Sequence, residues 1–187
     1  MGSQSIRYNE LIHIPGASLN SACYKLSKHL FDSRGFFSKI YPPLLKGGGV
    51  REVFYNFSKA GVARGLHYQA YPKAAERVVT VITGKVVDFV VRFDPTSHFL
   101  IDYEHSELGP HSVFNTAIVP GDSNHCHGFI ALEDSICLYL SSQEYSPEHD
   151  LGFDLLSLPF DFSSYFPLLP DSLIRSNRDL LFPKLKI

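Results

Sequence analysis

The stretch from Arg77 to Arg92 constrains the fold more than any other part of the chain. It contains two runs of β-branched and apolar residues separated by Thr83-Gly84-Lys85, a turn-forming sequence. The second run, from Val86 to Val91, is apolar at almost every position. A strand exposed on one face alternates between apolar and polar residues, whereas an unbroken apolar run is typical of a strand buried on both faces. The stretch therefore predicts two strands, the second of them deep in a core.

Shorter strand-like runs recur along most of the chain at intervals of about 8 to 12 residues, with turn signals between them. This rhythm predicts an all-β sandwich or barrel, and the absence of long helices between strands disfavours a Rossmann domain. Beyond Gly152, prolines break the chain into short pieces, and only residues 171–181 have a helical or semi-regular pattern. We expect residues 1–187 to form a single domain. The other expected strands are residues 51–57, 102–108, 113–119 and 136–140. Residues 1–23 suggest an early strand and a turn, and residues 24–31 could be a strand or a helical turn. Asp32-Ser33-Arg34-Gly35 predicts a turn, and Pro42-Pro43 predicts a loop.

Composition narrows the classes of function. The 187 residues are 44% hydrophobic, which is enough for a core. The net charge of −2 shows no excess of basic residues of the kind that binds nucleic acid or a membrane surface. A few local arginines would still suffice to bind a diphosphate. The three cysteines have no CxxC spacing, which argues against a disulfide framework or a zinc knuckle. No apolar run approaches the roughly 18 residues of a membrane span. With no signal-peptide core at the N-terminus, a reducing, cytoplasmic setting is expected.

The segment Gly61–Gln69 carries the first candidate for chemistry, because Arg64 and His67 lie three residues apart with Gly65 between them. On a regular strand these two side chains face opposite sides of the sheet. A β-bulge, which glycine permits, would bring both into one pocket. The alternative is a hairpin edge with an incidental histidine.

Two kinds of site can be built from the remaining polar residues. His67, His125 and His127 could bind a metal with Glu76, because His-x-His on a strand points both rings the same way. In a metal-free site, His67 is the natural base, Tyr139 can supply a proton from the opposite face, and Arg77 can stabilise an enolate oxygen. Taken singly, Tyr139 is more typical of a core tyrosine and Arg77 of a surface arginine.

Six pieces of the chain form an ordered set of motifs. They are Asp32-Ser33-Arg34-Gly35-Phe36-Phe37, Gly61-Val62-Ala63-Arg64-Gly65-Leu66-His67-Tyr68-Gln69, Gly84-Lys85-Val86-Val87-Asp88, His127-Gly128-Phe129, Tyr139 with Glu144-Tyr145-Ser146-Pro147, and Ser176-Asn177-Arg178-Asp179. In this order and spacing they resemble the dTDP-4-dehydrorhamnose 3,5-epimerases and related nucleotide-sugar epimerases. The resemblance covers residues from about Asp32 to Pro183, and its order and spacing make it specific for the family.

The resemblance implies a cupin-type jelly roll, usually a homodimer that exchanges strands, without metal or cofactor. It implies substrates that are nucleotide-linked 4-keto-6-deoxy sugars, in which the C4 carbonyl acidifies the protons at C3 and C5. Carried over position by position, His67 matches the base, Asp179 its carboxylate partner, and Tyr139 the acid that reprotonates the other face.

The same resemblance implies a set of substrate-binding residues. Three arginines match those that hold the diphosphate or orient the sugar, His127 matches a pocket histidine, and Phe37 falls where an aromatic stacks on the base, often across a dimer. Gln69 and Tyr145 lie in the matched pieces and complete the expected set. The arginines are Arg34, Arg64 and Arg178.

The chain also departs from the family pattern. Arg77 stands where the family has lysine, and arginine keeps the charge but does not readily give up a proton. Ser38 replaces a glutamate, and Glu52-Val53-Phe54 replaces a Gln-x-Asn sequence. Before His127 the chain has about two extra residues, which add His125. These changes leave the proposed catalytic trio intact but alter the residues expected to recognise the substrate.

The resulting expectation is an isomerase that inverts C3, C5 or both in a nucleoside-diphosphate 4-keto-6-deoxy sugar, in deoxysugar or surface-polysaccharide synthesis. Three alternatives stay open at this point. They are a 3,4-ketoisomerase on the same scaffold, a metal-binding cupin, and a binding protein that has lost turnover, which the change at Arg77 favours.

Overall fold

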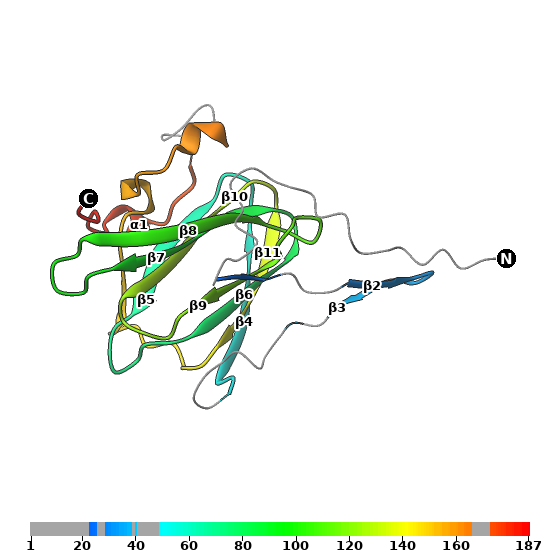
Figure 1. The fold of residues 1–187 in the computed structure, drawn as a ribbon, viewed down its shortest axis with the longest axis horizontal. Coiled ribbons are helices and arrows are strands. Elements are labelled where there is room, and N and C mark those ends of the chain that lie inside the picture. The colour runs from blue at the N-terminus through cyan, green and yellow to red at the C-terminus, as the bar shows by residue number, and fades with distance from the viewer. Residues whose placement is uncertain (1–22, 26–28, 39, 41–48, 166–172) are drawn as a thin grey trace.

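The computed structural model describes residues 23–25, 29–38, 40, 49–165 and 173–187. Within them the strands form two five-stranded antiparallel sheets and a separate hairpin (Figure 1). The early strand expected before residue 23 and the loop around Pro42-Pro43 lie outside the described residues. The all-β prediction is confirmed.

The first sheet has the strand order β1-β9-β6-β11-β4, and the second has the order β12-β5-β10-β7-β8. In chain order, the strands of both sheets are β1 (Tyr24–Lys25), β4 (Glu52–Ser58), β5 (Ala63–Gln69), β6 (Arg77–Thr83), β7 (Val86–Phe93), β8 (Leu100–Leu108), β9 (Thr116–Val119), β10 (His125–Ala131), β11 (Ser135–Ser141) and β12 (Asp150–Gly152). Strands adjacent in sequence thus often lie in different sheets, as in a jelly roll.

The two strands predicted from residues 77–92 are β6 and β7, and they belong to different sheets. The chain crosses between the sheets at Gly84, whose φ of +76° is accessible to glycine. A Cβ at this position would lie 2.3 Å from the carbonyl oxygen of Asp134, so the crossing also needs the absence of a side chain. The crossing lets consecutive strands cover the same core from opposite sides.

Strand β7 is buried on both faces, as its sequence predicts, because it lies between two cores. Val86 and Val90 face the core between the sheets, which also contains residues of β6, β9, β10 and β11. Val87 and Phe89 face the opposite way, into a second core that includes Phe153 and other residues of the C-terminal segment. An apolar run without alternation is therefore the sequence signature of this central position.

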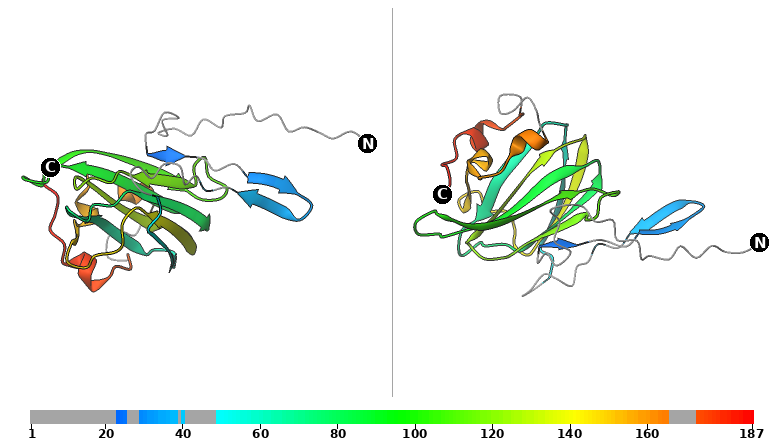
Figure 2. Two further views of the ribbon diagram at one scale, coloured as in Figure 1. Left: turned by 90° about the horizontal axis from the view of Figure 1, so that it is seen from below. Right: turned by 45° about the horizontal axis from the view of Figure 1, so that its top comes forward.

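The C-terminal segment covers the outer face of the second sheet in short pieces (Figure 2). The pieces are the 3₁₀ helices η2 (Leu155–Ser157) and η3 (Phe162–Ser164) and the single-turn helix α1 (Asn177–Leu180). The hydrogen bonds from the Ala63 amide to the Ile174 carbonyl and from the Ile174 amide to the Gly61 carbonyl fasten this segment to the start of β5. This attachment brings α1 next to the strand that carries His67.

The hairpin of β2 (His29–Asp32) and β3 (Gly35–Ser38) projects away from the two sheets, as all views show (Figures 1 and 2). Its turn is the one predicted from Asp32-Ser33-Arg34-Gly35, and Gly35 has a φ of +125°. No helix of the described residues is long and apolar enough to cross a membrane.

Candidate active site

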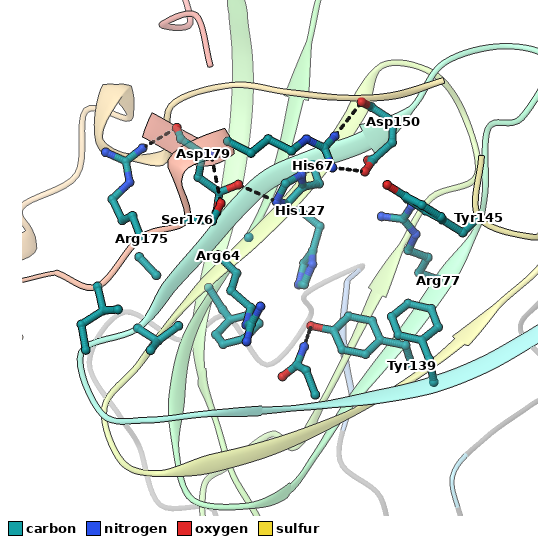
Figure 3. Close-up of a pocket in the computed structure, with 18 residues that line it drawn as sticks. Arg64, His67, Arg77, His127, Tyr139, Tyr145, Asp150, Arg175, Ser176 and Asp179 are labelled. Carbon is teal, nitrogen blue, oxygen red and sulfur yellow. Dashed lines mark hydrogen bonds and ion pairs between the residues drawn. The ribbon is translucent and has the colours of Figure 1, made fainter. Parts of the chain in front are cut away.

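A cavity of about 600 Å³ opens between the ends of the two sheets and the C-terminal segment (Figure 3). Eight of the eleven residues expected at the site line it: Arg64, His67, Arg77, His127, Tyr139, Tyr145, Arg178 and Asp179. Gln69 instead lines a neighbouring cavity of about 220 Å³, which shares Phe54, Arg77 and Tyr145 with the first. Arg34 and Phe37 are exposed on the projecting hairpin and do not line either cavity.

Arg64 and His67 reach the same cavity because β5 carries the predicted bulge. His127 of β10 lies opposite His67, whereas Phe129 lies opposite Arg64, so β5 has one residue more than its partner over this interval. The bulge is built around Gly65, with a φ of +102°. A Cβ on Gly65 would lie 2.6 Å from the His127 carbonyl oxygen, so the close approach of β5 to β10 requires glycine.

His67 is paired with a carboxylate. Its Nε2 atom lies 3.1 Å from Asp179 Oδ1, and its Nδ1 atom is buried without a hydrogen-bond partner among the described residues. Phe182 packs edge-on against the imidazole, with 5.2 Å between ring centroids. The ring is thus held on one side by charge and on another by an aromatic contact, with one nitrogen unused.

Asp179 owes its position to the start of α1. The Ser176 side chain caps this helix by accepting a hydrogen bond from the Asp179 amide, and the Gly65 amide donates to Asp179 Oδ2 at 3.4 Å. Burial raises the pKa of Asp179, but the hydrogen bond and charge of His67, with the amide of Gly65, outweigh it, so the pKa lies below its ordinary value. The carboxylate is therefore charged at neutral pH and lies against the imidazole of His67.

Tyr139 lies across the cavity from His67 (Figure 3). Its ring stacks on Phe54 with 4.7 Å between centroids, and its hydroxyl accepts a hydrogen bond from Asn56 Nδ2 at 3.2 Å. Burial is the main reason that the pKa of Tyr139 lies far above its ordinary value, and the nearby Cys137 adds to the shift. The hydroxyl accordingly keeps its proton at neutral pH and can act as an acid.

Arg77 lies between the two cavities and is largely enclosed. Burial lowers the pKa of its guanidinium, although the negative groups Asp150 and Glu52 oppose this shift. No hydrogen bond or ion pair of this side chain occurs within the part of the chain that the structure describes. Leaving an enclosed guanidinium without hydrogen-bond partners costs free energy, which a bound molecule could relieve. The N–H donors of Arg77 are therefore available to such a molecule.

The third polar pair in the cavity is fully buried. His127 Nε2 lies 2.7 Å from Asp88 Oδ2, and the two side chains are 5% and 0% exposed. Asp88 lies on the inner face of β7, between Val86 and Val90, where a lone carboxylate would be unstable. The pair places His127 edge-on to Tyr139, at a centroid distance of 6.4 Å.

The three histidines of the metal hypothesis each pair with a different carboxylate: His67 with Asp179, His127 with Asp88, and His125 with Asp122. In the described residues there is no group of three or more His, Cys, Asp or Glu side chains placed to hold one metal ion. The side chains present are therefore arranged as histidine–carboxylate pairs.

Cationic and amide side chains complete the walls. Arg178 forms an ion pair with Asp150 at 2.6 Å, and Arg175, which the motifs did not identify, pairs with Asp154 at 2.6 Å. The side chain of Gln69 donates to the Lys73 carbonyl and accepts from the Ser146 amide at 2.7 Å each. Gln69 therefore supports the loop after β11 rather than presenting a free amide to the main cavity.

Sequence reasoning also missed Asn56 and Asp88 as site residues. Asp88 interrupts the apolar run of β7, and a buried charge requires a partner. This position could therefore have been predicted to pair with another polar side chain. Asn56 has the same strand parity as Phe54, and both line the cavity. Strand alternation could therefore have placed Asn56 beside Tyr139 once the pairing of β4 and β11 was known.

The fold and these groups define an all-β protein of the cupin type, with acid–base side chains on opposite walls of one cavity. The family model for dTDP-4-dehydrorhamnose 3,5-epimerase matches residues 17–186. The chain belongs to this epimerase family, an isomerase family, as its motifs predicted.

Individual relatives agree with this assignment. A dTDP-4-dehydrorhamnose 3,5-epimerase of Mycobacterium tuberculosis is 34% identical over 102 residues, which are 54% of this chain and 49% of that protein. The namesake of Streptomyces griseus is 30% identical over 72% of this chain and 69% of its own length. The chain thus spans about half of the Mycobacterium protein that it matches and about two thirds of the Streptomyces one.

Among solved structures, a dTDP-4-dehydrorhamnose 3,5-epimerase of Bacillus anthracis with TDP and PPi bound superposes with a TM-score of 0.70. It is 26% identical, and the match covers 86% of this chain and 91% of that one. The similarity extends over nearly the whole fold and supports the jelly-roll assignment.

Proposed function

We propose that this protein is a nucleotide-sugar epimerase, which inverts C3, C5 or both in a nucleoside-diphosphate 4-keto-6-deoxy sugar. The observation that carries the proposal is the placement of His67, paired with Asp179, across one cavity from the protonated Tyr139. Inversion at a carbon next to a carbonyl needs a base on one face of the sugar and an acid on the other. The cavity provides both.

The reaction begins at His67. Its imidazole lines the cavity and takes the proton from the carbon beside the C4 carbonyl, and the electron pair moves to the carbonyl oxygen to give an enolate. The Asp179 carboxylate stabilises the resulting imidazolium through Nε2. The guanidinium of Arg77, which has no partner of its own in the described structure, stabilises the enolate charge.

Tyr139 completes the inversion. Its hydroxyl delivers a proton to the same carbon from the opposite face, and the electron pair of the enolate returns to restore the carbonyl. The product leaves an imidazolium and a tyrosinate, which regain their starting protonation states by exchange with water. Each turnover therefore exchanges substrate hydrogen with solvent, and this makes the reaction measurable by isotope.

Arginines provide a binding site for the diphosphate. Arg64 and Arg178 line the cavity, and the Bacillus anthracis relative was solved with TDP and PPi bound. Guanidinium groups suit phosphate oxygens because they offer paired donors in one plane. We place His127 and Tyr145 against the sugar or nucleotide, since both line the same cavity.

A homodimer is part of the proposal and gives roles to Arg34 and Phe37. The outer face of β4 exposes Val53, Tyr55 and Phe57 at 59%, 73% and 52%, an apolar row of the kind that marks interaction surfaces. The projecting hairpin carries Arg34 and Phe37 away from their own cavity, so they would act in the site of a second copy. Light scattering would show a dimer, and Tyr55→Asp would weaken it.

The three cysteines form no disulfide with one another, and burial raises the pKa of Cys137 to about 12. Two buried thiols, Cys126 and Cys137, and no disulfide among the three cysteines are consistent with the cytoplasmic location included in the proposal.

The experiment that tests the activity is proton NMR in deuterated water with dTDP-, CDP-, GDP- and UDP-linked 4-keto-6-deoxy sugars. Deuterium at C3, C5 or both establishes the epimerase and identifies the inverted centre. Deuterium entering elsewhere on the sugar would favour a ketoisomerase. A folded protein that binds one of these sugars but exchanges no hydrogen would overturn the proposal.

A further inference from the structure

A line of hydrogen bonds runs from a cation to the hydroxyl of Tyr139. Arg64 Nε donates to Ser58 Oγ at 2.9 Å, Ser58 Oγ donates to Asn56 Oδ1 at 3.3 Å, and Asn56 Nδ2 donates to Tyr139 Oη at 3.2 Å. Every bond in this line points the same way. Hydrogen bonds in series polarise one another, so the positive charge of Arg64 strengthens the donor that reaches Tyr139.

Several contacts hold the line in place. Ser58 is 1% exposed, and the exposed Arg64 is held by its bond to Ser58 and by a second hydrogen bond to the Phe57 carbonyl at 3.2 Å. At the other end, Phe54 stacks on the buried Tyr139 ring with only 5° between the planes. The direction of the bonds between Ser58 and Tyr139 is therefore set by packed groups.

The direction matters because a tyrosine hydroxyl has one hydrogen to donate. Since Oη accepts from Asn56, its own hydrogen is not used in that bond and remains available to the cavity. The same donor would remain in place when the proton leaves and would then face a tyrosinate. A neutral amide at this point would favour proton release, whereas a group that accepts from Tyr139 would oppose it.

We propose that Asn56, supported by Ser58 and Arg64, is a positioning residue that aims the Tyr139 proton at the substrate and stabilises the tyrosinate. This inference rests on the proposed epimerase function and adds a determinant of reprotonation. Asn56 is not needed to hold β4 against β11, because backbone pairing joins these strands from Ser135 to Ser141. The function of the amide thus lies in its hydrogen bond to the acid.

The test compares Asn56→Asp with Asn56→Ala in the deuterium NMR assay. The aspartate has nearly the same shape but, when ionised, accepts a hydrogen bond from Tyr139 instead of donating one. We expect product formation to fall about 100-fold in Asn56→Asp and about 10-fold in Asn56→Ala, in line with the loss of a donor to a developing anion. Exchange of deuterium back into the substrate depends on His67 and should change less than about threefold.

Lowering the pH supplies a second readout. The new carboxyl would lie beside Ser58 and Tyr139 and opposite Cys137 of β11, with Arg64 bonded to Ser58. Asp88 and His127 lie near Tyr139, and the partial burial of position 56 favours the neutral acid. Once protonated it can donate again, so product formation by Asn56→Asp should recover relative to Asn56→Ala as the pH falls. Unchanged product formation in Asn56→Asp, or product and exchange that fall by the same factor, would overturn the inference.

A double-mutant cycle separates this effect from a loss of structure. In the Tyr139→Phe background, Asn56→Asp should have no further effect on product formation, because the group that it acts on is absent. Additive losses would refute the proposed link. If the unmodified protein itself catalyses no exchange, the epimerase proposal fails instead, so the two failures are distinguishable.

Discussion

The two walls of the cavity control their acid–base groups by different means. On the wall formed by β5 and α1, His67 is joined to the charged Asp179 at 3.1 Å. On the wall formed by β4 and β11, Tyr139 is surrounded by an aromatic ring and the neutral amide of Asn56. One wall therefore uses an opposite charge and the other uses burial and a neutral hydrogen bond.

This difference matches the two halves of an inversion. A base must tolerate a positive charge after it takes a proton, and a neighbouring carboxylate provides that tolerance. An acid must keep its proton until the enolate forms, and burial ensures this by raising the pKa of Tyr139. One cavity can thus hold an acid and a base that do not neutralise each other.

The largest expected effect comes from removing the base itself. His67→Ala should lower both deuterium exchange and product formation by about 10⁴-fold, the upper range for a general base. Nucleotide binding, measured by calorimetry, should be nearly unchanged because the arginines remain. Normal exchange by the variant would show that the base lies on the other wall.

The next variant removes the negative charge of Asp179 but keeps the shape of its side chain. It tests whether an opposite charge supports His67 on the wall formed by β5 and α1. Asp179→Asn should lower exchange by about 10³-fold, since the imidazolium loses its counter-charge.

The same carboxylate also affects the stability of the fold. The pKa of Asp179 lies below the ordinary value, so the carboxylate stabilises the fold above the unfolded-state pKa, and this contribution is lost as the pH falls through the folded-state pKa.

Thermal unfolding measured across the acid range checks this second effect. The Asn variant should be less stable than the parent at neutral pH, and the difference should shrink as acid is added. A constant difference between the two proteins would contradict a charged Asp179.

Tyr139→Phe tests the other wall and should have a smaller effect on the first chemical step. Product formation should fall about 10²-fold, because one proton donor is lost while the packing against Phe54 is kept. Deuterium should still enter the substrate through His67. Equal losses of exchange and product would contradict a division of labour between the walls.

The smallest effect is expected from Arg77→Lys. Arg77 lies between the two walls, and this substitution keeps its positive charge. With dTDP-4-keto-6-deoxyglucose we expect the rate to change by about 10-fold or less. The substitution replaces the planar set of guanidinium N–H donors by one ammonium group but keeps the charge. A larger gain in rate would indicate that the natural substrate differs from dTDP-4-keto-6-deoxyglucose. Arg77→Gln, which removes the charge, is the matched control and should be slower than both.

Much of the fold follows from local sequence patterns. The apolar run in β7 and the turn at Gly84 predicted two strands because each pattern reflects the environment of its own residues. The expected helical pattern at residues 171–181 contains α1, whereas η2 and η3 were not predicted. Such signals are local, so one chain is enough to interpret them.

The motifs likewise identified His67, Tyr139 and Asp179 as a group, but the sequence left open whether they converge. Their meeting depends on how β5 bulges at Gly65 and on how residues near Ile174 dock against the start of that strand. These contacts join segments far apart in the sequence, and no periodic pattern encodes them. The exposed positions of Arg34 and Phe37, away from the cavity of their own chain, likewise depend on how the β2–β3 hairpin leaves the sheets.

The sequence by itself thus determined the all-β class, the family and the chemical types of the site residues, since these depend on residue identity and spacing. Only the tertiary structure decided that a carboxylate lies beside His67 and a neutral amide beside Tyr139. Both partners are supplied by other elements of the fold, α1 in one case and β4 in the other. A pKa is set by what surrounds a group in space, and that environment exists only after the sheets have packed.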